Sequence, residues 1–340
     1  MKLSNFVKTA LVAASMAVAT GAAYAKDYRF VMVSHIGSND ANMGWLTESL
    51  KAFEKKYPNV KTEYISTNNY SVQEHVRLLE QAIATKPDGI AVPIVSADAF
   101  EGPLRKAIAA GIPVVAFNIP DARPEGKRIP YLTYVGGDEY LTGKHLGQYA
   151  LAQVKAGKVP KPTRVVCAVH DAAHQGLKAR CKGMREVMEA SGAKFDELFI
   201  GAEPATARNA LQAYLQSNKD ANYIFTVAGW SSPWAWDVAN KMGLSPDVDN
   251  KGVTILTVDE GPVSIEGVKA GRLLAANSQG FWLQGYAPME WLYWHHELGY
   301  EAKSDILTGP VIIHKDNAEK WAKLVRGVFG DAEYKKQTGW

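Results

Sequence analysis

Short apolar runs alternate with amphipathic stretches along the first part of the chain. Residues 28–36 form a run typical of a buried strand, and residues 45–57 carry apolar side chains at helical spacing. Ser71 and Glu74 make a capping box, which predicts the start of another helix. Alternating strands and helices of this kind predict a parallel sheet covered on both faces. The other elements predicted here are strands at 60–65, 89–94 and 112–117 and a helix at 100–110.

The same alternation starts again after residue 130. Residues 132–135 resemble a strand, residues 141–155 a helix, and a polar, proline-bearing loop covers 154–162. Gly192 ends a later helix as its C-cap. The remaining predicted elements are strands at 165–169, 195–200, 223–227 and 253–258 and helices at 176–191, 205–217 and 233–242.

These two series predict the fold class α/β, with two Rossmann-like lobes that each contain a parallel sheet. A chain of 340 residues is also long for a single hydrophobic core. Ligands of such sheets bind outside the carboxyl ends of the strands. Two lobes that face each other would therefore share one binding cleft.

The N-terminal residues have the pattern of an export signal. Lys2 and Lys8 give a positive start, residues 9–23 are apolar, and Ala23-Tyr24-Ala25 fits a cleavage site. A transmembrane anchor is the alternative, but the apolar run is shorter than the roughly 20 residues that a spanning helix needs. We expect residues 1–25 to be a cleaved signal peptide and the mature protein to reside in the periplasm.

Charge and motifs exclude several function classes. The net charge is only +3 and no basic stripe stands out, so we expect no nucleic-acid partner. No Walker loop, Gly-x-Ser-x-Gly or His-Glu-x-x-His motif occurs, and the eight histidines lack the spacing of metal ligands. We therefore expect no enzyme activity, no metal and no cofactor.

The chain has two cysteines, Cys167 in a predicted strand and Cys181 on the helix that follows it. A strand and its crossover helix pack face to face, and an exported protein meets an oxidising compartment. A disulfide is favoured over the alternative of two buried thiols. Its short loop would contribute on the order of 3 kcal/mol in the chain-entropy model.

Polar side chains follow several of the predicted strands, where a ligand site is expected. Asn118 follows the strand at 112–117, Asp259 the strand at 253–258, and Gln279 the apolar stretch 273–276. Loop caps and turn residues are the alternative interpretation of each position alone. Their joint placement favours a binding site.

Aromatic side chains at two further positions could flank the cleft. Trp45 stands near a helix start and Trp230 follows a strand end. Aromatic faces stack on the apolar faces of sugar rings, although they also fill ordinary cores. His35 and His170 are secondary candidates for ligand contacts.

Several short motifs resemble those of the type I periplasmic sugar-binding proteins of ABC transporters, especially the ribose-binding group. The resemblance covers nearly all of the mature chain, and lactose-repressor-type regulators share the fold but carry a DNA-binding segment at the N-terminus. The motifs are Lys86-Pro87-Asp88-Gly89-Ile90, Ala110-Gly111-Ile112-Pro113-Val114-Val115, Tyr134-Val135-Gly136-Gly137-Asp138, Arg180-Cys181-Lys182-Gly183-Met184, Val258-Asp259-Glu260-Gly261 and Val268-Lys269-Ala270-Gly271-Arg272-Leu273.

The resemblance implies a set of ligand contacts. Asn42 matches an asparagine that donates to hydroxyls, and Trp45 an aromatic residue that stacks on the sugar. Arg180 matches an arginine that clamps ring oxygens, Asp259 an aspartate that accepts from hydroxyls, and Gln279 a glutamine near the last hinge crossing.

The chain also departs from the ribose-binding pattern. Asn118-Ile119 stands where those proteins have Asp-Arg, and Ala228 stands where they have an asparagine, next to Trp230. A charged pair and an amide are lost and an indole is gained. A differently shaped sugar, a polyol or a furanose signal therefore suits the site as well as ribose.

The implied mechanism is closure of the lobes around three hinge segments, near residues 136–138, 277–280 and 308–311. The partners implied are a sugar or polyol and the permease of an ABC importer, and we expect a monomer. Two rivals remain: a sensory protein that presents its ligand to a chemoreceptor or kinase, and an exported sugar-processing enzyme. The predicted first lobe comprises residues 26–137 and 280–309, and the second 138–279 and 310–340.

Overall fold

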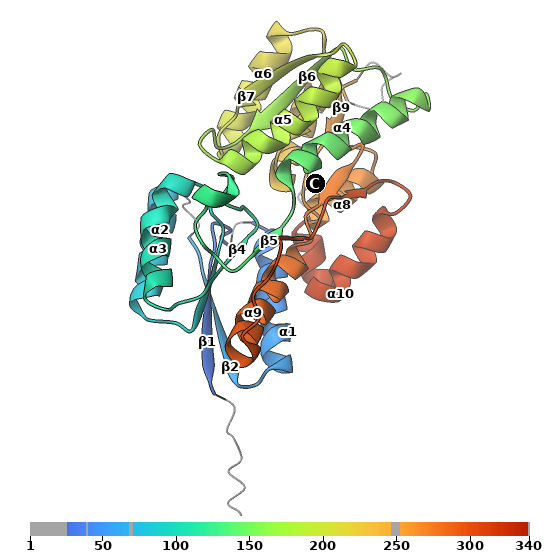
Figure 1. Ribbon diagram of the computed structural model, residues 1–340. Helices are drawn as coiled ribbons and strands as arrows, with labels where there is room; N and C mark the ends of the chain where they lie inside the picture. Colours follow the sequence, from blue (N-terminus) through green and yellow to red (C-terminus); the bar gives the residue numbers. More distant parts are fainter. Residues whose placement is uncertain (1–25, 39, 68–70, 246–251, 339–340) are drawn as a thin grey trace, which may run out of the picture.

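The computed structural model describes residues 26–38, 40–67, 71–245 and 252–338. Within these ranges it contains two α/β lobes that stack one above the other, with α10 returning beside their junction (Figure 1). The predicted signal peptide lies outside the described residues. Among the described helices, none combines the length and apolarity that a bilayer span requires.

The first lobe is built on a six-stranded sheet in which all neighbouring strands pair in parallel. Its strand order is β11-β5-β4-β3-β1-β2. The pair α2 and α3 covers one face, and α1 and α9 cover the other (Figure 1). The elements are β1 (Tyr28–Val33), α1 (Asn42–Lys56), β2 (Val60–Ile65), α2 (Val72–Ala84), β3 (Gly89–Val92), α3 (Ala97–Ala109), β4 (Val114–Phe117), β5 (Tyr134–Gly136), α9 (Phe281–Leu298) and β11 (Ile306–Leu307).

The second lobe has a four-stranded parallel sheet in the order β7-β6-β8-β9. Helices α4 and α5 pack together on one face, and α6 and α7 lie on the other. An antiparallel pair, β10 and β12, leads to α10, which packs on α8. The elements are α4 (Glu139–Lys155), β6 (Arg164–Val169), α5 (Gln175–Ala190), β7 (Lys194–Phe199), α6 (Pro204–Ser217), β8 (Ala221–Thr226), α7 (Ser232–Lys241), β9 (Thr254–Leu256), α8 (Pro262–Lys269), β10 (Ala276–Ser278), β12 (Val311–Ile313) and α10 (Ala318–Lys336).

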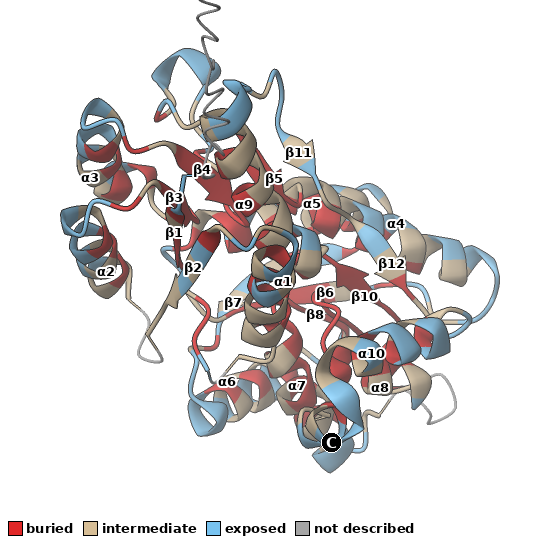
Figure 2. Ribbon diagram, turned by 90° about the horizontal axis from the view of Figure 1, so that it is seen from below, coloured by how far each residue is buried: buried red, intermediate tan, exposed pale blue. Residues whose placement is uncertain are grey.

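The central strands are apolar at successive positions because both faces of each sheet are covered. In β1, Val31 and Val33 pack with α2 and α3, whereas Phe30 and Met32 pack with α1 and α9. These central strands are accordingly buried, and the helices turn their exposed faces outward (Figure 2). The predicted α/β class with parallel sheets in two lobes is confirmed.

Some apolar runs extend beyond the strands that they predict. The run 28–36 includes Ser34, His35 and Ile36, but β1 ends at Val33. Residues His35 and Ile36 line the space between the lobes instead. Burial at a strand's carboxyl end therefore has two causes here, the sheet core and the cleft.

The chain passes between the two lobes at three places: from β5 to α4, from β10 to α9 and from β11 to β12. Each connection is short. These crossings coincide with the predicted hinge segments, whose role in motion stays a prediction. The predicted lobe limits likewise stay a prediction.

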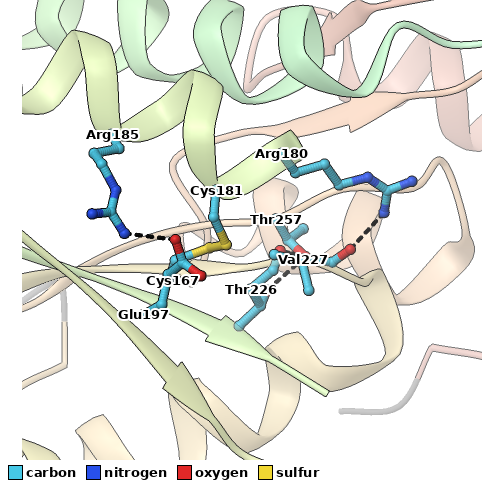
Figure 3. Close-up of a disulfide and its surroundings, with 8 residues drawn as sticks. All are labelled: Cys167, Arg180, Cys181, Arg185, Glu197, Thr226, Val227 and Thr257. Carbon is cyan, nitrogen blue, oxygen red and sulfur yellow. Dashed lines mark hydrogen bonds and ion pairs between the residues drawn. A yellow bond between two sulfur atoms is a disulfide. The ribbon is translucent and has the colours of Figure 1, made fainter. Parts of the chain in front are cut away.

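A disulfide links the second sheet to one of its covering helices. Cys167 on β6 and Cys181 on α5 are joined, with their Cα atoms 5.9 Å apart, and both residues are buried (Figure 3). Arg180 is the residue before Cys181 and extends from the same end of α5 (Figure 3). The disulfide therefore anchors the helix that carries a predicted site residue.

Candidate functional site

A cavity of about 650 Å³ lies between the lobes, at the carboxyl ends of the strands. Both lobes and the crossing before α9 contribute to its lining. All but one of the predicted ligand-contact residues border it. Those that do are His35, Asn42, Asn118, His170, Arg180, Trp230, Asp259 and Gln279.

Two of these residues owe their position to an unusual backbone conformation. Asn118, directly after β4, has φ 58°, and Asp259, after β9, has φ 76°. Asn and Asp tolerate this left-handed region better than other residues with a side chain. The chain turns sharply there, and the two polar side chains enter the cavity in place of a continued strand.

Arg180 is held in place by three acceptors. Its Nε donates to the carboxylate of Glu139, its Nη1 to the carbonyl oxygen of Val227 at 2.6 Å and its Nη2 to Oε1 of Gln279 at 2.9 Å. The guanidinium and Glu139 are both buried. Burial raises the pKa of Glu139 although Arg180 opposes the shift, and Glu139 raises the pKa of Arg180 against the effect of burial.

This ion pair limits what can be learned from replacing the arginine. Removal of Arg180 would leave Glu139 as an uncompensated buried carboxylate, which typically costs about 3–5 kcal/mol. A variant at Arg180 would report on folding as much as on ligand binding. Asp259 and Gln279 are better positions for testing the site.

Gln279 connects the polar groups of the two lobes. Its Oε1 accepts from Arg180 and, at 3.4 Å, from Nδ2 of Asn118, while its Nε2 donates to Oδ1 of Asp259. The backbone N–H of Gly229 donates to Oδ2 of Asp259 at 2.9 Å. Donors and acceptors thus alternate around the cavity, as recognition of a polyhydroxylated ligand requires.

Three buried polar atoms on the cavity wall have no hydrogen-bond partner among the described residues. They are Oδ1 of Asn42, Nδ1 of His170 and Nδ1 of His174. Buried polar atoms are nearly always paired in folded proteins. These atoms are therefore suited to pair with groups of a ligand.

The cavity has a negative electrostatic character. The carboxylates of Asp171, Glu203 and Asp259 line it, whereas the charge of Arg180 is balanced by Glu139. Asp40 lines it too but carries only part of a charge near neutral pH. Burial and then the nearby charge of Asp259 raise the pKa of Asp40 to about 7. Such a cavity disfavours anionic ligands and accepts neutral ones.

Trp45 was predicted to flank the cleft and stack on the ligand, and its position shows that this prediction is wrong. Trp45 does not border the cavity but is 3% exposed, and its ring contacts that of Phe329 at 4.9 Å between centroids. It lies nearly one turn further along α1 than Asn42, on the face that packs into the core. The indole at the cavity is Trp230, whose ring lies 4.8 Å from His170 and 5.1 Å from Trp234.

Sequence reasoning assigned no role to several residues that line the cavity. His174 directly precedes α5 and its ring lies 5.7 Å from that of His35 on the other lobe. Asp40 precedes α1, and its Oδ1 accepts from the N–H of Asn42 at 2.8 Å. Their place just before a helix that follows a strand could have marked them, because those loops form the edge of the cleft. No group of three or more His, Cys, Asp or Glu suited to a metal ion occurs in the described part of the chain.

Known proteins resemble this chain in sequence and in fold. A family model described as a periplasmic binding protein domain matches residues 30–297. Among curated proteins, the xylose/arabinose-binding protein XylF of Sulfolobus acidocaldarius is 28% identical over 265 residues. That match covers 76% of this chain and 64% of XylF, so this chain spans less than two thirds of that relative.

Solved structures share the fold over most of their length. A carbohydrate transporter from Acidothermus cellulolyticus 11B, in complex with myo-inositol, is 23% identical with a TM-score of 0.77, over 89% of this chain and 99% of that one. An ABC sugar transporter (periplasmic sugar-binding protein) from Legionella pneumophila is 25% identical with a TM-score of 0.72, over 83% and 99% of the two chains. A galactofuranose-binding protein has a TM-score of 0.76 at 18% identity, over 88% and 99%.

Proposed function

The chain belongs to the periplasmic binding protein family, and on that premise we propose that it captures a small sugar or polyol and delivers it to an ABC importer. The relatives and structural neighbours named above include binders of xylose, arabinose, myo-inositol and galactofuranose. All of these ligands are neutral and rich in hydroxyl groups. The cavity of this chain has the matching charge and polarity.

One observation carries the proposal. Buried amide, guanidinium and carboxylate groups from both lobes converge on one cavity, and some of their neighbours lack a partner within the described residues. Hydroxyl groups can donate and accept in turn, so a sugar satisfies such a set. A ligand with a misplaced hydroxyl would leave a buried polar atom unpaired, at a cost of about 1–3 kcal/mol. This cost gives the site its selectivity.

Binding is coupled to closure of the lobes. Gln175 of the second lobe donates through Nε2 to the carbonyl oxygens of Ile94, at 2.9 Å, and Pro120, at 3.3 Å, in the first lobe. These bonds exist only when the lobes are together. A ligand that contacts both lobes shifts the equilibrium toward this closed form, which the permease then recognises.

The proposal includes the route and the state of the protein. Residues 1–25 direct export and are removed, and the mature chain works as a periplasmic monomer. Family members are binding proteins, and we expect the ligand to leave the site chemically unchanged. Recovery of intact sugar after prolonged incubation would agree with this, and turnover would revive the enzyme alternative.

A ligand screen tests the function. Mature protein, from Lys26 on, is screened by thermal shift against pentoses, hexoses, polyols and furanose signals, and hits are quantified by calorimetry. A ligand that binds only the folded state stabilises it by about 2.7 kcal/mol at 100 times its Kd, so a hit raises the melting temperature. Absence of a shift with every sugar and polyol would overturn the proposal.

Asp259→Asn is the matched site variant. Asn tolerates the left-handed backbone at this position and keeps the side-chain shape, so the variant changes charge and hydrogen bonding rather than the fold. We expect the Kd of the identified sugar to rise about tenfold or more, because a hydrogen bond to a charged group is lost. Asp220→Asn, at an exposed ion pair with Arg164, is the control and should leave the Kd unchanged.

A further inference from the structure

A second hollow of about 740 Å³ adjoins the cavity described above. Asp40, Trp230 and Trp234 line both spaces, so they form the boundary between an inner compartment, the first cavity, and an outer compartment, the second hollow. Residues from both lobes also enclose the outer compartment. They include Met43 and Glu48 of α1, Arg208 of α6, Val263 of α8 and Phe329 and Lys336 of α10.

Aromatic rings run from one compartment into the other. His170 borders the inner compartment, Trp230 and Trp234 border both, and successive ring centroids are 4.8 and 5.1 Å apart. The two indoles are only partly buried. Sugar rings and other flat or apolar groups pack on aromatic faces of this kind. A ligand that starts in the inner compartment can therefore continue along the indoles.

The outer compartment also offers a fixed polar group. The guanidinium of Arg208 lies 6.0 Å from the ring of Trp234, and Nε and Nη2 donate to Oδ2 of Asp237 at 3.1 and 2.7 Å. These contacts limit its freedom, so little entropy is lost when it binds a hydroxyl group. Charged side chains at Glu48 and Lys336 add further hydrogen-bonding capacity at the same wall.

The size of the two compartments exceeds what one sugar ring requires. The inner compartment alone lies within the range of about 300–1,000 Å³ typical of whole small-molecule sites. Because residues from both lobes line the outer compartment, an occupant of both compartments contacts both lobes in this closed form. A group that projects from the inner sugar through the boundary at Trp230 would gain contacts rather than clash.

We propose that the ligand is a two-unit sugar, a disaccharide or a sugar joined to another polyol, with one unit in each compartment. The proposal rests on the sugar-binding function proposed above and names the class of ligand more closely. The first unit binds the polar set around Arg180, Asp259 and Gln279. The second unit packs on Trp230 and Trp234 and receives a hydrogen bond from Arg208.

Calorimetry with matched ligand pairs tests this proposal. D-xylose is compared with xylobiose, D-glucose with cellobiose, D-galactose with lactose and myo-inositol with galactinol, on mature wild-type protein. We expect at least one two-unit ligand to bind about tenfold more tightly than its single-unit parent, as stacking and one hydrogen bond provide. Single units that bind while every two-unit ligand binds equally or more weakly would overturn the proposal. If nothing binds in this panel or in the ligand screen described above, the sugar-binding function itself fails, and this inference with it.

The variant Arg208→Ala tests whether the higher affinity for a two-unit ligand arises in the outer compartment. The ratio of two-unit to single-unit affinity should fall to about threefold or less, because the hydrogen bond to the second unit is lost. Arg185→Ala is a matched control: Arg185 has nearly the same exposure, an ion pair with Glu197 and a ring contact with Phe195, but does not border either compartment. A ratio that responds equally to both variants, or to neither, would contradict the assignment.

Discussion

Four histidines meet where the lobes face each other, and two of them, His75 and His174, are buried. His35 and His75 come from the first lobe, His170 and His174 from the second, and the rings of His35 and His174 are 5.7 Å apart. Burial, followed by the charges of His170 and Arg180, lowers the pKa of His174 to about 3. Burial and Arg180 likewise lower the pKa of His170 to about 3. The closed protein therefore keeps these rings neutral in conditions where an exposed histidine would be charged.

This arrangement predicts a loss of stability in acid. The unfolded chain binds a proton at His174 near pH 6.5, whereas the folded protein does so only near pH 3. Between these values the unfolded state holds more protons. For this residue, the free energy of unfolding therefore falls by about 1.4 kcal/mol for each unit by which the pH is lowered. We expect His174→Gln to reduce the slope of stability against pH by that amount between pH 6 and pH 4, measured by urea unfolding. His145→Gln, at an exposed position of α4, should retain the wild-type slope.

Two carboxyl groups act in the opposite direction. Burial raises the pKa of Asp40 and of Glu260 to about 7. Their contribution is present at low pH and is lost as the pH rises through 7. The wild-type profile is the difference between these effects, so the comparison of variants is the informative measurement. A His174→Gln protein with an unchanged slope would show that the ring is not buried as described.

Single residues show where sequence reasoning works and where it stops. Asn118 and Asp259 could be predicted as site residues because each follows a strongly apolar strand, and strand ends of parallel sheets meet at the cleft. The place of Trp45 could not be predicted, because an aromatic residue near a helix start suits a hydrophobic core and a ligand site equally well. His75 on α2 is fully buried, with Nε2 3.4 Å from the carbonyl oxygen of Val33. Histidine has both an apolar ring and polar atoms, so hydrophobic periodicity does not predict whether it is buried.

Helices α4 and α5 approach each other closely through two glycines. A methyl group at Gly183 would meet the carbonyl oxygen of Tyr140, and one at Gly143 would meet that of Arg180. Both contacts are with backbone, which cannot rotate away. The close packing sets the distance between Glu139 at the start of α4 and Arg180 on α5, which form the buried ion pair of the site.

Gly183→Ala should therefore force the helices apart. We expect a loss of about 1–3 kcal/mol in the free energy of unfolding from overpacking, and weaker ligand binding because Arg180 moves relative to Glu139. Chemical denaturation and calorimetry measure the two effects. Gly327→Ala on α10 is the control: nothing lies within 4 Å of its added methyl group, so helix propensity alone should stabilise the protein by about 0.5–1 kcal/mol. Equal effects of the two substitutions would refute the close-packing argument.

Element boundaries differed from their predictions for a physical reason. The strand predicted at 253–258 is β9, Thr254–Leu256, and the residues after it turn into the cavity at Asp259. Hydrophobicity reports burial, and residues at the cleft are as buried as those in a sheet. Cys167 and Cys181 were placed correctly on β6 and α5 because strand-to-helix packing is local. The outer compartment could not be predicted from the sequence, because it depends on α10 packing near α1 from a distant part of the chain.

At the scale of the whole molecule, Gln175 links the two lobes by hydrogen bonds, and this link is called the clasp below. Its hydrogen bonds to Ile94 and Pro120 favour the closed form independently of any ligand contact. We expect Gln175→Ala to shift the ligand-free protein toward the open form and to weaken ligand affinity by about two- to tenfold. Small-angle scattering should give a larger radius of gyration without ligand and the wild-type value at saturation.

The exposed Gln148 on α4 provides the matched control. Gln148→Ala should change neither the radius of gyration nor the affinity. If Gln175→Ala behaves in the same way, the clasp does not contribute to closure. A variant that is open even at saturating ligand would instead indicate that the lobes cannot close without it.

The order of elements along the chain has a consequence for how the protein folds. The first lobe consists of β1 to β5 and is completed by α9 and β11, which come only after the whole second sheet. Until then, the face of its sheet that α9 covers, and the side of α1 that packs on α9, stay uncovered. Contacts between segments so distant in sequence form slowly, and an incomplete lobe exposes apolar surface. We infer that this lobe cannot finish folding while the chain is still being made, which suits the export that we propose for this protein.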